Sequence, residues 1–267
     1  EQEKACPLPR VFVCDAMRHL AKAVGASLLL IGCGQPPLSA HDRTPPAAPP
    51  PPSAEAELPV AAEEAPRPLT PNDYRLRLIE LKKRVQESGP SDLPRVGQPA
   101  FDQLVSLGNL TRLDDAAGLD ERVSTAQGYL SVIPGLFPLY GRPDFRPEQI
   151  ALTQLLLTLV SKTYGLSTAQ VEGAPDSDDA RKTHDQLVQM LLGTLGGALK
   201  MTREEAYSKA DRQQLVALVA ETVSNVGTTL PTEARASLRE TLDGFLADAP
   251  SGLELISLTQ ARSSLGA

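Results

Sequence analysis

The sequence predicts an all-α domain over residues 72–267, an irregular bundle of about seven or eight helices. Three observations point to this class. Apolar residues recur at intervals of three and four along most of the stretch. Glycine or proline separates the periodic segments. No run of alternating apolar and polar residues is long enough to predict a strand.

The first helix is predicted over residues 72–88, with Asp73 favourable to the dipole of its first turn. Four apolar residues lie on one face of this helix: Tyr74, Leu78, Leu81 and Val85. A short helix is predicted over 101–107 and a longer one over 120–133, where Pro134 ends it.

A strongly apolar helix is predicted to begin at Pro147 and to end at Gly165 as its C-cap. Because it has almost no polar face, we expect it in the middle of the domain. The acidic loop 176–179 leads into the next helix, which is interrupted by the glycines Gly193, Gly196 and Gly197. Glycine lowers helix stability, so this cluster predicts a close approach of another helix, with a ligand against the bare backbone as the alternative.

Three more helices are predicted towards the C-terminus. Thr202-x-x-Glu205 fits a capping box at the start of the first, and Gly227 ends it. The second begins at Pro231-Thr232-Glu233, and the last runs over 253–265.

Residues 134–147 form the most aromatic stretch of the chain, with Phe137, Tyr140 and Phe145. Two interpretations are open. Exposed aromatic rings often anchor interfaces, which makes these residues candidates for contact with a partner. Alternatively, they fill the core beside Leu136 and Leu139, and this is the interpretation we favour.

The N-terminal part has the pattern of an export signal. From Met17 a short basic region leads into an apolar run over 23–31, which Gly32 and Cys33 follow. This run is shorter than the roughly 20 residues of a transmembrane helix. Leu30-Ile31-Gly32-Cys33 resembles the lipobox of bacterial lipoproteins, with an aliphatic residue, a tolerant position, a small residue and a cysteine. A chance occurrence of these letters in a buried strand is the alternative.

The resemblance covers residues 17–33 only, and it implies that residues 17–32 are a signal peptide cleaved between Gly32 and Cys33. Cys33 would then carry a diacylglycerol thioether and an N-acyl chain, and two or more acyl chains anchor a protein stably. This covalent lipid is the only cofactor that we expect. The cysteine is not followed by aspartate but by Gly34, which in a Gram-negative host implies the outer membrane, at its periplasmic face or the cell surface.

Residues 1–16 precede the expected start at Met17 and contain the other two cysteines, Cys6 and Cys14. We interpret these residues as an upstream extension from a wrongly assigned start, with a genuine extra segment as the alternative. If Met17 is the start, Cys33 is the only cysteine of the mature protein.

Residues 33–71 form the predicted link between the anchor and the helical domain. Residues 34–71 contain 12 of the 24 prolines, and the rest are mostly Ala, Glu and Ser. This composition cannot bury enough apolar surface to fold, so we expect a disordered tether. A coil of this length averages about 35 Å from end to end. A PxxP ligand for an aromatic-lined groove is the alternative.

The net charge of −7 argues against binding nucleic acid and against electrostatic docking on anionic lipid. The chain has no GxSxG motif, and a phosphate-binding glycine loop with its lysine is also absent. His184 is the only histidine of the predicted domain, and we interpret it as a solvated surface residue rather than a metal ligand. Paired carboxylates of a glycosidase remain open, but the chain has no tryptophan for a sugar platform.

These observations favour a membrane-anchored lipoprotein of the bacterial cell envelope. Its helical domain would bind an envelope protein as an adaptor or assembly component, while the acyl chains on Cys33 bind the membrane. The alternative is a helical carrier of a lipid or another small apolar ligand, lined by the glycines of 193–197. A third hypothesis is an envelope hydrolase, but we expect no catalytic residue and no metal site.

Overall fold

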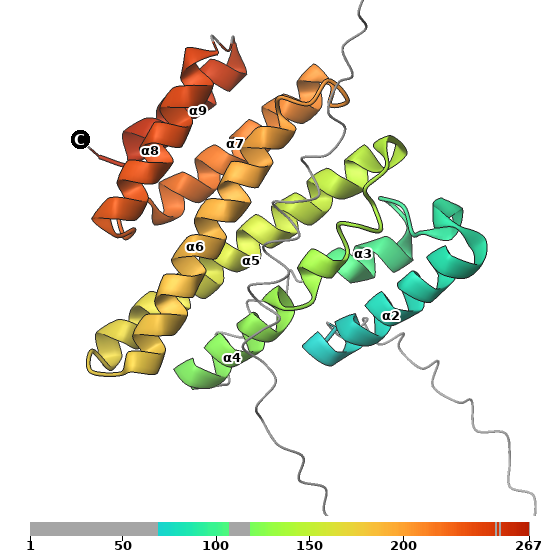
Figure 1. Ribbon diagram of the computed structural model, residues 1–267, viewed down its shortest axis with the longest axis horizontal. Helices are drawn as coiled ribbons and strands as arrows, with labels where there is room; N and C mark the ends of the chain where they lie inside the picture. Colours follow the sequence, from blue (N-terminus) through green and yellow to red (C-terminus); the bar gives the residue numbers. More distant parts are fainter. Residues whose placement is uncertain (1–68, 107–117, 249, 251, 267) are drawn as a thin grey trace, which may run out of the picture.

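The computed structural model describes residues 69–106, 118–248, 250 and 252–266. These residues form eight α-helices with three short 3-10 segments and no strand, which confirms the all-α class (Figure 1). The α-helices are α2 (Pro71–Ser88), α3 (Pro99–Val105), α4 (Leu119–Leu130), α5 (Arg146–Gly173), α6 (Asp178–Met201), α7 (Lys209–Val226), α8 (Thr232–Ala247) and α9 (Leu253–Ser264). The 3-10 segments are η1 (Pro90–Asp92), η3 (Ile133–Gly135) and η4 (Pro143–Phe145). The predicted signal, Cys33 and the tether up to residue 68 lie outside the described residues.

Helix α5 is the centre of the bundle, as its apolar sequence predicts. It packs against α6, α4, α7 and α3, and its residues Leu152, Leu157 and Val160 are at most 1% exposed. Helix α9 packs on α7 and α8, while α2 packs on α4. Figure 1 therefore shows α2 at one side of the bundle and the α8–α9 pair at the opposite side. None of the described helices combines the length and the apolar composition that crossing a membrane requires.

The prediction that Gly165 ends this central helix is wrong, because α5 continues to Gly173. Gly165 is not among the glycines with a positive φ, and it lies exposed inside the helix. The buried face continues on both sides of it, since Tyr164 is 1% exposed and Ser167 is fully buried. Burial of the following turn therefore outweighs the weak helix propensity of one glycine.

The predicted start of the helix after α6 is displaced by several residues. Helix α7 begins at Lys209, and its capping box consists of Ser208 and Asp211 rather than Thr202 and Glu205. Thr202 instead caps the C-terminus of α6, where its hydroxyl donates to the Leu199 carbonyl at 2.6 Å. A local capping pattern cannot distinguish these two sites when both lie in one turn region.

Helix α2 begins at Pro71, inside the range assigned to the tether. Thr70 is its N-cap and forms a capping box with Asp73. The boundary of the folded part therefore lies a few residues before the predicted one.

The predicted close approach at the α6 glycines is not found at two of them. A Cβ at Gly196 or Gly197 would meet nothing within 4 Å, and Gly193 is exposed. The tight contacts lie elsewhere. A Cβ at Gly135 would lie 2.7 Å from Leu78 Cδ2, and one at Gly227 would lie 3.0 Å from the Ser264 carbonyl oxygen.

Candidate interaction surface

The three aromatic residues proposed as partner contacts belong to the core. Phe137 is 9% exposed, Tyr140 is fully buried and Phe145 is 1% exposed. The Tyr140 ring packs edge to face on Phe145 at 5.3 Å and on Phe101 at 5.8 Å between centroids. The structure thus supports the core interpretation, since buried rings cannot anchor a partner.

These aromatics fix the segment that follows η1. The Tyr140 hydroxyl donates to the Pro94 carbonyl at 3.1 Å, and the Arg95 guanidinium lies 4.3 Å from the centroid of Phe145. Arg95 Nε also lies 3.2 Å from Glu148 Oε1, which accepts the Val96 backbone N–H at 2.9 Å. The cluster stabilises the attachment of this segment to the start of α5.

A second buried polar group joins α5 to the turn before α7. The Tyr207 hydroxyl donates to Gln149 Oε1 at 2.5 Å, and Arg146 Nη1 donates to the same oxygen at 2.5 Å. Burial raises the pKa of Tyr207 to about 12, against the lowering effect of the Arg146 charge. A phenol of this pKa keeps its proton at neutral pH, so the hydroxyl stays a hydrogen-bond donor to Gln149 and joins α5 to the turn before α7.

His184 is not the solvated surface residue that the sequence predicts. Its ring packs on Tyr164 at 5.1 Å between centroids, and its Nδ1 lies 3.2 Å from Ser167 Oγ. Although serine beside histidine is the pairing of a nucleophile with its base, Ser167 is fully buried and its hydroxyl lies 2.8 Å from the Tyr164 carbonyl oxygen. This pair therefore joins α5 to α6 and cannot reach a substrate.

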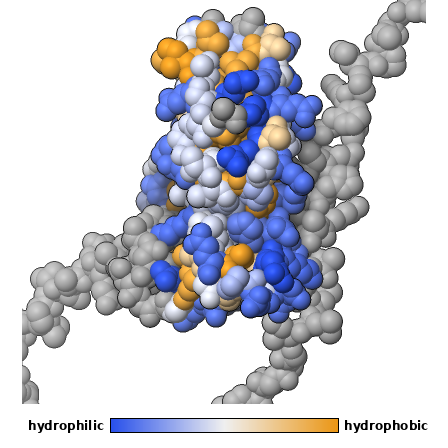
Figure 2. All heavy atoms as spheres, turned by 90° about the vertical axis from the view of Figure 1, so that its left-hand side faces the viewer, coloured by the Kyte–Doolittle hydropathy of each residue, from blue (hydrophilic) through white to orange (hydrophobic). Residues whose placement is uncertain are grey.

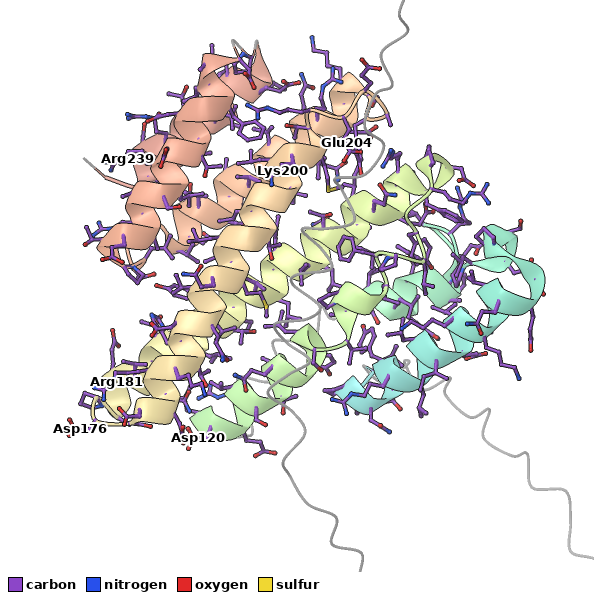
Figure 3. All side chains as sticks on the ribbon, in the orientation of Figure 1. Asp120, Asp176, Arg181, Lys200, Glu204 and Arg239 are labelled. Carbon is purple, nitrogen blue, oxygen red and sulfur yellow. The ribbon has the colours of Figure 1, made fainter. Side chains whose placement is uncertain are left out.

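Two open hollows lie on the surface of the described residues. One, of about 360 Å³, lies between α4 and the α5–α6 turn, and its polar lining includes Asp120 and Gln170, joined by a 2.7 Å hydrogen bond. Figure 3 shows Asp120 at the end of the bundle that also carries Asp176 and Arg181. The other, of about 350 Å³, lies along α2 and includes Leu69 and Leu76. The residues described include no group of three or more His, Cys, Asp or Glu that could hold a metal ion.

The start of α9 presents the largest cluster of exposed apolar side chains among the described residues. Leu253 is 60% exposed, Leu255 44% and Ile256 61%. We call these three residues the α9 patch. Figure 2 shows apolar surface at the upper end of this face, where Figure 1 places the start of α9.

The α9 patch is held in place by its inner face. Leu258 and Ala261 are buried at 3% and 1% exposure. Glu254 lies 3.9 Å from Arg212 of α7 in an ion pair, and Arg262 pairs with Asp243 of α8. The three apolar side chains therefore project from a fixed helix. Sequence periodicity did not identify them, because Leu253, Leu255 and Leu258 all look like core positions until the packing partner is known.

No family model matches this chain, and no curated protein or solved structure matches it either.

Proposed function

We propose that this chain is a lipid-anchored lipoprotein of the bacterial cell envelope whose helical domain acts as a binding module for an envelope protein. The sequence supports the anchor through the lipobox at Leu30–Cys33 and the proline-rich stretch that follows it. The domain supports the binding role through the α9 patch.

The α9 patch is the observation that carries the binding role. Isolated exposed apolar residues are common on soluble proteins, but Leu253 and Ile256 lie three residues apart on one side of α9 and form an exposed apolar pair, while Leu255 faces another side of the helix. Helix α9 has no net charge, with Glu254 and Arg262 as its only charged residues. An apolar surface without flanking net charge suits the central part of a protein interface, which is depleted of charged residues.

Palmitate labelling of the chain made in a bacterial host tests the anchor. We expect the label on the parent chain and its loss in Cys33→Ala. Labelling that persists in Cys33→Ala would show that this cysteine is not the site of acylation.

Site-specific crosslinking tests the binding module. A photoreactive residue at position 256, in place of Ile256, should crosslink one envelope protein of defined mass, and Leu253→Asp should abolish that product. The same photoreactive residue at the exposed Lys182 of α6 is the matched control and should not form it. An identical product from both positions would contradict binding through α9.

A further inference from the structure

Helix α2 has an outer face that the bundle does not cover. Tyr74 and Leu81 point inward and are buried, with 1% and 4% exposure. On the opposite face, Leu76 is 57% exposed and Ile79 is 64% exposed. At 100° per residue, Lys83 and Glu87 lie with these two side chains on the outer face, where they form an exposed ion pair at 3.8 Å. The helix is thus apolar on two sides, and only one side has a partner within the described residues.

The charges of α2 are distributed unevenly around this outer face. On one flank, Glu80 pairs with Arg84 at 2.5 Å and with Arg77 at 3.3 Å. On the other flank, Arg75 and Lys82 are exposed and form no ion pair with another described residue. The apolar pair Leu76 and Ile79 is therefore bordered by cations that are available to an anionic partner.

Helix α2 is also the exception in an acidic chain. It contains five basic and three acidic residues, a net charge of +2, whereas the whole chain carries −7. No other α-helix of the described part has a net positive charge. The expectation that overall acidity excludes an anionic lipid surface does not hold for this face, because electrostatic attraction acts within about a Debye length of 8–10 Å.

We infer that the outer face of α2, defined by Arg75, Leu76, Ile79, Lys82 and Lys83, docks on the anionic lipid surface of the membrane that anchors the chain. This inference rests on the proposed function for the identity of the anchor. Charge complementarity favours lipid over a protein partner here, and it distinguishes α2 from the uncharged α9 patch. The position of α2 in the sequence also favours the membrane as partner, because Pro71 of α2 follows the proposed anchor Cys33 by only 38 residues.

Two exposed apolar side chains and the two cations Arg75 and Lys82 bind a bilayer weakly on their own. The tether changes this balance, because it makes docking an intramolecular step with an effective concentration of about millimolar order. The coil that the composition of residues 34–71 predicts would average about 35 Å from end to end, enough to bring α2 to the surface without full extension. The domain would therefore alternate between a docked and a released state.

Vesicle flotation of the full-length chain with Cys33→Ala tests the docking without the acyl chains. Vesicles contain equimolar phosphatidylglycerol and phosphatidylcholine, or phosphatidylcholine alone. Arg75→Glu combined with Lys82→Glu breaks no ion pair described in the structure. We expect this double variant to lower the partition coefficient on anionic vesicles by at least about 25-fold, at about fivefold for each basic residue.

The matched control is Lys182→Glu combined with Lys209→Glu, which changes the net charge equally at the exposed starts of α6 and α7. It should leave the partition coefficient within about twofold of the parent. Equal losses in the two double variants, or no loss in either, would overturn the inference. Far-UV circular dichroism verifies that both variants keep their helical content.

Salt and an apolar substitution give an independent measurement. Raising the NaCl concentration should weaken binding of the parent to anionic vesicles but should change the Arg75/Lys82 variant little. Ile79→Ser should lower binding severalfold at every salt concentration. A photoreactive residue at position 79 that crosslinks a protein rather than lipid in cells would also overturn the inference.

Different results refute the proposed anchor at Cys33 and the proposed docking of α2. Palmitate labelling at Cys33 with vesicle binding that ignores α2 would leave the lipoprotein in place and refute the docking. Absence of the label would refute the proposed anchor, while flotation of the Cys33→Ala chain would still decide whether α2 binds anionic lipid.

Discussion

Replacing Gly227 by alanine should destabilise the fold at the contact between α7 and α9. A Cβ at this position would lie 2.7 Å from the Val223 carbonyl oxygen, 3.0 Å from the Ser264 carbonyl oxygen and 3.2 Å from Leu265 Cδ2. Two of these are backbone atoms of helices, and Leu265 is 1% exposed. The two carbonyl oxygens are fixed in the backbone of α7 and α9 and the Leu265 side chain is packed in the core, so the end of α7 must shift against α9.

The magnitude follows from two opposing terms. Overpacking of a well-packed contact costs about 1–3 kcal/mol. Alanine recovers about 0.4–1 kcal/mol by restricting the unfolded chain. We therefore expect Gly227→Ala to lower the free energy of unfolding by about 1–2 kcal/mol, equivalent to a decrease in Tm of about 2–8 °C for a domain of this size.

Urea unfolding followed by far-UV circular dichroism measures this change. Gly165→Ala is the control, because Gly165 lies exposed inside α5 and a Cβ there would meet nothing within 4 Å. This variant should be more stable than the parent by about 0.5–1 kcal/mol. A Gly227→Ala variant as stable as the parent would refute the tight α7–α9 contact. A destabilised Gly165→Ala variant would contradict the continuous course of α5.

Three further predictions concern buried polar and aromatic groups. Burial raises the pKa of Tyr207 to about 12 from its ordinary value near 10. The contribution of the protonated Tyr207 to stability is therefore complete below about pH 10 and is lost as the pH rises towards 12. Urea unfolding midpoints between about pH 10 and 12 should fall less steeply in Tyr207→Phe than in the parent. Glu148→Ala leaves the Val96 N–H without its acceptor, so we expect a loss of about 1–3 kcal/mol and faster hydrogen exchange at Val96. Tyr140→Ala should cost about 3–5 kcal/mol in urea unfolding, whereas an exposed interface residue would cost almost nothing.

Helical periodicity predicted the elements of this fold well because each helix buries one stripe. The stripe Tyr74, Leu78, Leu81 and Val85 identifies α2, and all four side chains are buried or half-buried. The central place of α5 follows from its lack of a polar face. Pro147 was also informative, since it lies at the second position of α5, whereas Pro71 and Pro99 lie at the first position of α2 and α3 but were predicted to lie outside these helices.

Helix ends were predicted less well, because they depend on what packs on the next turn. Gly165 has the sequence of a C-cap, but the burial of Ser167 carries the helix past it. The prediction for the α6 glycines failed for a related reason. Which glycine lies against a neighbour depends on the rotation of α6, and in the structure the close approach occurs at Gly227, where the sequence predicted only a helix end.

The candidate surfaces were the least predictable part, because they are defined by the absence of a packing partner. Leu76 and Leu81 have the same side chain in the same helix, yet one is 57% exposed and the other 4%. Only the packing partners of α2, which include α4 and η1, separate them. An apolar residue that stays exposed can therefore be identified only when the packing of the helices is known.

We expect different partners at the two exposed apolar faces, because their local charge differs although their apolar side chains are alike. On α2, Arg75 and Lys82 border the exposed pair, so burial against another protein would leave cations desolvated unless acids faced them. A lipid surface supplies such acids as headgroups and leaves the cations hydrated. The α9 patch has no such cations within α9 near it, and it lies at the opposite side of the bundle in Figure 1. Docking through α2 would then direct the α9 patch away from the membrane, where it could meet a protein partner without leaving the lipid surface.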